Sequence, residues 1–343
     1  MYSSSVIFFL FALLVVFIFS LSYFFNILPN RKSGLKDLYS EGLDMLIAGR
    51  RKLAYKNFKE ITAKDTNSVK AYIRLGQIIR ESGNPEQALK IHKNLTLRKN
   101  LSYYDNLEIK KNLVLDYYKL SNIKKSIDEL NEILKFDKKN EWALNHIILI
   151  YKKTNNWKRA YSYLEKKMSY SNAKDEHLLA LYKIQEGRMF LKDQKYIDSR
   201  KLFESALLLK NIPIIYYFIG ISYSEQSDEL YNIAIKESED EDISSIENMD
   251  EIKGLLSKAI EMWIQYLELK PEQAWLVLHL IKDALFALDR FSEYEVILKE
   301  NLNRDPNNVD MIANLSDIFS NRGENKEALE LIDSALEKDA TSL

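Results

Sequence analysis

The sequence predicts an all-α protein, a right-handed α-solenoid of stacked helix pairs preceded by one transmembrane helix. Three observations predict this fold: a helix–turn–helix pattern that recurs along the chain, a long uncharged apolar stretch near the N-terminus, and few helix-breaking residues. The 343 residues include nine Gly and five Pro, which favours helices over many-stranded sheets. Because one helix pair cannot bury its apolar face alone, repeated pairs stack into a single elongated body.

The apolar stretch at residues 6–28 is predicted to be a transmembrane helix. It carries no charged side chain, and at 1.5 Å per residue it would be about 34 Å long, enough for a hydrocarbon core of ~30 Å. A cleaved signal peptide is the competing interpretation, but it requires a basic segment before the apolar core and a small-residue cleavage site. Met1 to Ser5 contain no Lys or Arg, so we expect an uncleaved anchor.

Residues 29–34 are predicted to form a short basic tether. Arg31 and Lys32 follow the apolar stretch directly, and Lys36 comes soon after. Since Lys and Arg flanking a membrane span favour the cytoplasmic side, the sequence predicts a single-pass membrane protein whose repeats face the cytoplasm.

The clearest repeat lies at residues 69–102. Gly76 and Ala88 occupy the small positions of its first and second helices, and Ser82 to Pro85 form the turn. This is the 34-residue tetratricopeptide pattern W-x₂-L-G-x₂-Y…A-x₃-F…P, with substitutions at its weaker positions. The predicted tetratricopeptide-repeat solenoid spans residues 35–342, with repeats at about 35–68, 69–102, 107–140, 141–174, 180–213, 214–273, 275–308 and 309–342.

Two of these repeats depart from the pattern. The sixth contains an acidic insertion near residues 225–252. Like charges at this density predict disorder from Ser238 to Asp250, as a solvated spacer or an interaction tail. In the seventh repeat, Tyr294 occupies the usual alanine position.

No motif of the sequence is typical of an enzyme. The four histidines are scattered, and no zinc-protease, phosphate-loop, dinucleotide or nucleophile-elbow motif is present. His92 takes the aromatic position of a second helix and is predicted to pack in the core. There is no cysteine for a disulfide or metal site, and the net charge is −1. We therefore predict no catalysis, cofactor or metal, no small-molecule substrate and no nucleic-acid partner.

Polar side chains on the first helices of repeats two to four are candidate protein-binding residues, because first helices line the concave face of such a solenoid. The candidates are Lys70, Arg74, Gln77, Arg80, Lys111, Asn112, Tyr118, Trp142, Asn145 and Lys152. They are net basic with two aromatic anchors, which suits an acidic or C-terminal peptide segment. The alternative interpretation is a solvated helix face in a Lys-rich protein.

From Asp37 to about Leu134 the chain resembles the lipopolysaccharide assembly protein B family. The resemblance rests on YSEGLDML at Tyr39–Leu46, on VKAYIRLGQIIRESGNPEQALKIHKNL at Val69–Leu95, and on the similar stretch that runs from Leu101 to Leu134. Family members are bacterial inner-membrane proteins with one N-terminal helix and cytoplasmic tetratricopeptide repeats. They regulate the level of the deacetylase that commits precursor to lipid A, together with the membrane protease FtsH.

The resemblance implies an adaptor that brings a biosynthetic enzyme to a membrane protease. Two features depart from the family pattern. Family members end in a rubredoxin-like metal module with two Cys-x-x-Cys pairs, whereas this sequence has no cysteine, and the acidic insertion is also unlike the family. The alternative function is an extracytoplasmic tetratricopeptide-repeat assembly chaperone for outer-membrane or secretion machinery.

Overall fold

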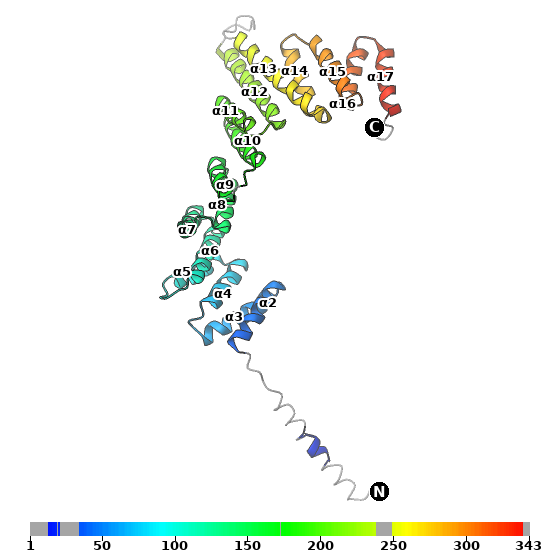
Figure 1. The fold of residues 1–343 in the computed structure, drawn as a ribbon. Coiled ribbons are helices and arrows are strands. Elements are labelled where there is room, and N and C mark those ends of the chain that lie inside the picture. Colours follow the sequence, from blue (N-terminus) through cyan, green and yellow to red (C-terminus); the bar gives the residue numbers. More distant parts are fainter. Residues whose placement is uncertain (1–12, 19, 21–33, 172, 238–248, 339–343) are drawn as a thin grey trace, which may run out of the picture. The chain divides into compact units, whose positions relative to one another are not determined.

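A computed structural model describes residues 13–18, 20, 34–171, 173–237 and 249–338 (Figure 1). Most of the predicted transmembrane span at 6–28, and nearly all of the tether at 29–34, lie outside these residues. Among the described helices, none combines the length and the apolar character needed to cross a bilayer.

The described part of the chain from residue 34 onward is helical and contains no strand. Its elements are α2 (Leu35–Ile47), α3 (Arg51–Lys64), α4 (Val69–Glu81), α5 (Pro85–Thr96), α6 (Tyr103–Lys119), α7 (Ile123–Phe136), α8 (Glu141–Lys153), α9 (Trp157–Ser171), α10 (Glu176–Lys192), α11 (Tyr196–Leu207), α12 (Ile214–Glu237), α13 (Met249–Leu269), the 3-10 helix η2 (Pro271–Leu276), α14 (Leu278–Ala287), α15 (Ser292–Arg304), α16 (Val309–Asn321) and α17 (Asn325–Lys338).

Two compact units make up the chain, residues 1–138 and 139–343. In the first unit, α2 packs on α3, α4 on α5 and α6 on α7, and the pairs stack through contacts of α3 with α4 and of α5 with α6. In the second unit the same order continues from α8 to α17 (Figure 1). The prediction of an all-α chain of stacked helix pairs is confirmed, whereas the handedness of the solenoid stays a prediction.

The turn between the two helices of most pairs contains one residue in the left-handed region of backbone space. Gly83 has φ +92°, and Ser121, Asn155 and Gln194 take the same place with φ of 57°, 55° and 58°. The next helix then begins at a side-chain cap in several pairs; for example, the Asn122 carboxamide oxygen accepts a hydrogen bond from the Lys125 backbone N–H. These local rules set where one helix ends and the next begins.

Close contact between a first-helix glycine and a second-helix ring recurs in the described chain. The pairs are Gly42 with Phe58, Gly76 with His92, Gly187 with Phe203 and Gly220 with Trp263. A Cβ atom placed on Gly76 would lie 2.4 Å from His92 Nε2, and one on Gly220 would lie 2.3 Å from Trp263 Nε1. The small residue is therefore required because the ring occupies the space that a methyl group would need.

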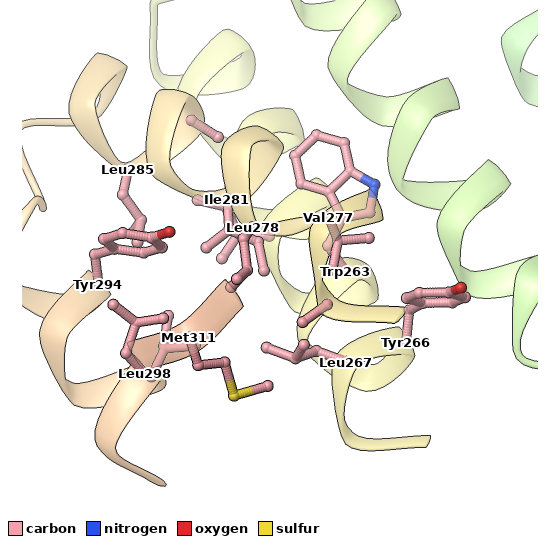
Figure 2. Packing of buried hydrophobic residues seen from close by; sticks show 14 of the residues in the cluster. Trp263, Tyr266, Leu267, Val277, Leu278, Ile281, Leu285, Tyr294, Leu298 and Met311 are labelled. Atoms are coloured by element: carbon pink, nitrogen blue, oxygen red, sulfur yellow. The ribbon is translucent and has the colours of Figure 1, made fainter. Parts of the chain in front are cut away.

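A large core cluster of the described residues lies in the second unit and includes the seventh repeat. Trp263 and Tyr266 of α13, Ile281 of α14 and Tyr294 of α15 are all buried in it (Figure 2). Tyr294 replaces the usual small residue, and its hydroxyl donates to Asn314 Oδ1 of α16 at 2.9 Å. The larger ring fills space between α14, α15 and α16, which explains how this repeat keeps a packed core without the alanine.

The predicted acidic insertion is helical at both of its ends. Helix α12 continues to Glu237 and α13 begins at Met249. Residues 238–248 of the segment predicted to be disordered lie outside the described residues. The two helices are the longest of the described chain, at 24 and 21 residues, and they pack on each other.

Candidate protein-interaction surface

A row of polar side chains runs along α4 in the first unit. Lys70 is exposed, and Arg74 Nη1 donates to Gln77 Oε1 at 2.9 Å. Gln77 Nε2 donates to Glu81 Oε1 at 3.0 Å, and Arg51 Nε of α3 donates to Glu81 Oε2 at 2.9 Å. Burial opposes ionisation of Glu81, but the hydrogen bonds from Gln77 and Arg51 outweigh it and lower the pKa of this carboxyl. The row is thus ordered before any partner binds.

Arg80 and Asn112 do not belong to that row. The sequence predicts that both side chains point outward, and this is wrong: their exposed fractions are 8% and 5%. Arg80 Nη1 donates to Asp116 Oδ1 at 2.9 Å and to Asn112 Oδ1 at 3.1 Å. Because α6 lies beside α4, it covers the end of the Arg80 side chain. These residues join two neighbouring repeats, and a role in partner binding stays a prediction.

His92 completes this buried cluster. Its Nδ1 lies 2.5 Å from Asp116 Oδ2 and its Nε2 lies 3.2 Å from the Ile73 carbonyl oxygen. Both ring nitrogens therefore lie within hydrogen-bond distance of an oxygen atom. The prediction that His92 is a core residue is confirmed, with an exposed fraction of 0%. Asp116 is not among the residues predicted from the sequence; its signal there is a lone carboxylate in an otherwise apolar stretch of α6.

The remaining candidates lie on α6 in the first unit and on α8 in the second. Lys111 and Tyr118 of α6 are half-buried. On α8, the Trp142 ring stacks on the His146 ring with centroids 3.9 Å apart, and Lys152 Nζ lies 5.5 Å from the centroid of the Tyr182 ring.

Asn145 Oδ1 accepts a hydrogen bond from Lys167 Nζ at 2.7 Å. The structure therefore places the candidates on helices α4 and α6 of the first unit and on helix α8 of the second, and it brings Arg80 into contact with Asn112.

A groove in the first unit is lined by residues outside the predicted set. It has a volume of about 290 Å³, and its lining residues are Arg51, Lys52, Tyr55, Ile78, Ile79, Ser82, Asn84 and Gln87. Two cationic side chains stand beside a tyrosine ring and an apolar floor, with amide groups at one edge. This combination can hold a carboxylate next to an apolar side chain. No sequence signal singled it out, because it forms only where α3, α4 and the start of α5 meet.

No metal site accompanies these surfaces. Within the described residues, no group of three or more His, Asp or Glu side chains is arranged to hold a metal ion. The described surface offers hydrogen-bond donors, charge and aromatic rings, which are the means of peptide recognition.

Comparison with curated proteins shows similarity to proteins named Lipopolysaccharide assembly protein B. The protein of this name from Escherichia coli strain K12 is 26% identical over 128 residues, which is 37% of this chain and 33% of that protein. The one from Haemophilus influenzae is 22% identical over 270 residues, which is 76% of this chain and 61% of that protein. These matches confirm the family resemblance, and the chain spans from a third to about three fifths of the length of these relatives. No family model matches the chain.

Solved structures with a similar course of the chain include tetratricopeptide-repeat proteins. A protein from Parabacteroides merdae is 15% identical with a TM-score of 0.40, covering 87% of this chain and 98% of that one. The C-terminal part of a repeat protein from Cytophaga hutchinsonii is 16% identical with a TM-score of 0.41, covering 81% of this chain and 99% of that one.

Proposed function

We propose that this chain is a protein-binding adaptor in lipopolysaccharide assembly, anchored in the inner membrane with its repeats in the cytoplasm. The similarity over 270 residues to a protein named Lipopolysaccharide assembly protein B carries the proposal. Stacked helix pairs support it, because such arrays present extended surfaces for other proteins. The adaptor itself performs no bond chemistry.

The proposed partners are the membrane protease FtsH and the deacetylase of lipid A biosynthesis, as the family resemblance implies. An anchor at residues 6–28 would confine the repeats to the membrane surface. Confinement raises the effective concentration of a membrane protease near a bound enzyme without any further contact. The physical task of the chain is then to hold the enzyme where the protease can reach it.

An acidic peptide segment of the partner would bind along α4 and in the neighbouring groove. Lys52 and Lys70 are exposed, and Arg51 and Arg74 are held in place by hydrogen bonds to Glu81 and Gln77. Pre-positioned guanidinium groups lose less conformational entropy when a carboxylate binds. The groove beside Tyr55 would accept an apolar side chain of the same segment.

Site-specific photo-crosslinking in membranes tests the partner. A photoreactive residue at Gln87, which lines the groove, should crosslink to the deacetylase or to FtsH, as identified by mass spectrometry. The matched control carries the probe at Lys201, an exposed position of α11. Equal crosslinking from both positions, or none from Gln87, would refute the proposed surface.

Removal of residues 1–30 tests the anchor. The truncated chain should leave the membrane fraction and lose its effect on deacetylase level, while circular dichroism still shows a helical protein. An undiminished effect on the deacetylase level without these residues would refute the role of the anchor.

A fusion of alkaline phosphatase after Leu343 tests the topology. The fused enzyme should be inactive in cells, because it matures only outside the cytoplasm; an active fusion would overturn the proposed topology.

A further inference from the structure

The last helix pair of the described chain leaves an apolar face uncovered. A groove of about 640 Å³ lies on α16 and α17, and its lining residues are Val309, Ile312, Ala313, Ser316, Asp317, Ser320, Asn325, Ala328, Leu329 and Ile332. Leu329, Ile332 and Leu336 of α17 have exposed fractions of 59%, 38% and 39%. Their spacing of three and four residues puts them on one face of the helix.

The preceding pair shows what covers such a face in this fold. Leu298 of α15 stands 34 residues before Ile332 and is fully buried. It lies in one core cluster with Met311, Leu315 and Ile318, the apolar stripe of the following first helix, α16. The apolar face of a second helix thus packs against an amphipathic first helix, and α17 has the same kind of apolar face.

The first described helix pair, by contrast, has charged side chains on its outer face. Asp37, Glu41 and Asp44 of α2 are exposed, and they stand 34 residues before Ala71, Leu75 and Ile78 of α4. Those three residues of α4 are buried. A polar outer face is the usual way to end a repeat array. The first pair has one, whereas the last described pair does not.

The charge around the open face indicates the chemistry of its occupant. Glu330 and Asp333 are exposed on α17 within one turn of Leu329 and Ile332, and Asp317 lines the groove itself. Glu330 pairs with Lys326 at 3.8 Å and Asp317 with Lys282 at 3.6 Å, both in exposed ion pairs that a bound cation can replace at little cost. At the matching positions α15 carries Val296 and Lys299. The acidic flank therefore belongs to α17 and is not a general feature of second helices. It would attract Lys and Arg on a bound helix.

We propose that the face formed by α16 and α17 binds an amphipathic helix of a partner protein, one with an apolar stripe and basic flanks. A second copy of this chain fits less well. Two α17 faces would bring Glu330 and Asp333 of both copies together, and docking of α2 would bring Asp37 and Glu41 onto the same acidic flank. Like charges in such a contact oppose association.

A helical peptide with the sequence of α4, Val69–Glu81, is a suitable probe. It carries Leu75 and Ile78 where α16 carries Leu315 and Ile318, and it adds three basic side chains, Lys70, Arg74 and Arg80. Fluorescence anisotropy of the labelled peptide with the full chain should show saturable binding. The peptide with its three basic residues changed to Glu should bind at least about tenfold more weakly, because its charges would then repel the acidic flank of α17. A tenfold change in affinity corresponds to about 1.4 kcal/mol.

Variants of the chain locate the binding. Ile332→Glu should weaken peptide binding at least about tenfold. Ile233→Glu on α12, where the exposed fraction is a similar 44%, should leave it unchanged. Circular dichroism checks that both variants stay folded. Equal binding of the charge-reversed peptide, equal affinity in Ile332→Glu, or no binding at millimolar concentration would overturn the proposal. So would a concentration-dependent dimer in sedimentation that Ile332→Glu abolishes, because the occupant would then be a second copy.

Discussion

At the scale of single residues, the packing of Gly76 against His92 decides how closely α4 and α5 approach. The ring of His92 replaces the usual aromatic side chain and also holds Asp116 of the next repeat. One small residue thus sets the position of a group that links two helix pairs. A change at Gly76 should therefore also affect the packing of the next repeat, which His92 contacts through Asp116.

Gly76→Ala should destabilise the protein by about 1–3 kcal/mol, the usual cost of overpacking a core. The added methyl group would lie 2.4 Å from His92 Nε2, so either the ring or the helix must move. Gly254→Ala is the matched control, because no atom lies within 4 Å of the position that its methyl group would take. In helix α13 it should be neutral or stabilising. Urea unfolding followed by circular dichroism compares the two, and similar midpoints would contradict this account.

The carboxylate of Asp116 is the common partner of two buried side chains, those of Arg80 and His92. Asp116→Asn would leave Arg80 and His92 without it, and breaking a buried ion pair in this way costs about 3–5 kcal/mol. We expect the free energy of unfolding to fall by that amount, which urea unfolding would show as a lower midpoint. Glu132→Gln removes the exposed ion pair with Lys135 and should leave the midpoint unchanged. A midpoint for Asp116→Asn equal to that of the natural chain would show that the cluster does not stabilise the fold.

At the scale of elements, α11 and α12 hold a tyrosine in an acidic environment. Burial, together with the charge and hydrogen bond of Glu229 and the charges of Glu225 and Asp228 on α12, raises the pKa of Tyr196 from 10.0 to about 12. The unfolded chain loses this proton first, so the contribution of Tyr196 to stability is complete below pH 10 and is lost as the pH rises toward 12.

Tyr196→Phe should therefore flatten the alkaline part of the stability profile. Between pH 9 and about pH 11.5, the natural chain should lose more free energy of unfolding than the variant does. Urea unfolding at a series of pH values measures the difference. Parallel profiles would show that Tyr196 ionises equally in the folded and unfolded states.

At the scale of the whole molecule, charge is divided unevenly along a chain that is almost neutral in total. Residues 1–210 contain 38 Lys and Arg against 22 Asp and Glu, whereas residues 211–343 contain 11 against 28. The candidate groove and the row on α4 belong to the basic part. The open face of α17 belongs to the acidic part. The basic surface of α4 and the groove should therefore prefer an acidic partner segment, and the acidic face of α17 should prefer a basic one.

A Glu-rich peptide should bind the full chain with an affinity that falls as salt increases. Exposed charges are screened beyond about 10 Å at 0.1 M salt. Lys52→Glu combined with Lys70→Glu should weaken binding about tenfold at low salt, from the loss of two charge contacts, and by less at high salt. Lys201→Glu, exposed on α11, is the control. Fluorescence anisotropy measures all three, and a salt-independent affinity would rule out charge as the basis of recognition.

The sequence by itself determined the helix pairs, because the spacing of small and apolar residues such as Gly76 and Ala88 reflects contacts within one pair. Only the tertiary structure decided which polar side chains remain available. The helical period predicts that Arg80 and Asn112 point outward, yet both are buried. The period gives the face of the helix on which a residue lies but not which neighbouring helix covers that face. The groove beside Tyr55 and the uncovered face at Ile332 also depend on where a neighbouring helix is present or absent. Contacts between elements far apart in sequence have no local period, and for that reason three-dimensional packing alone settles them.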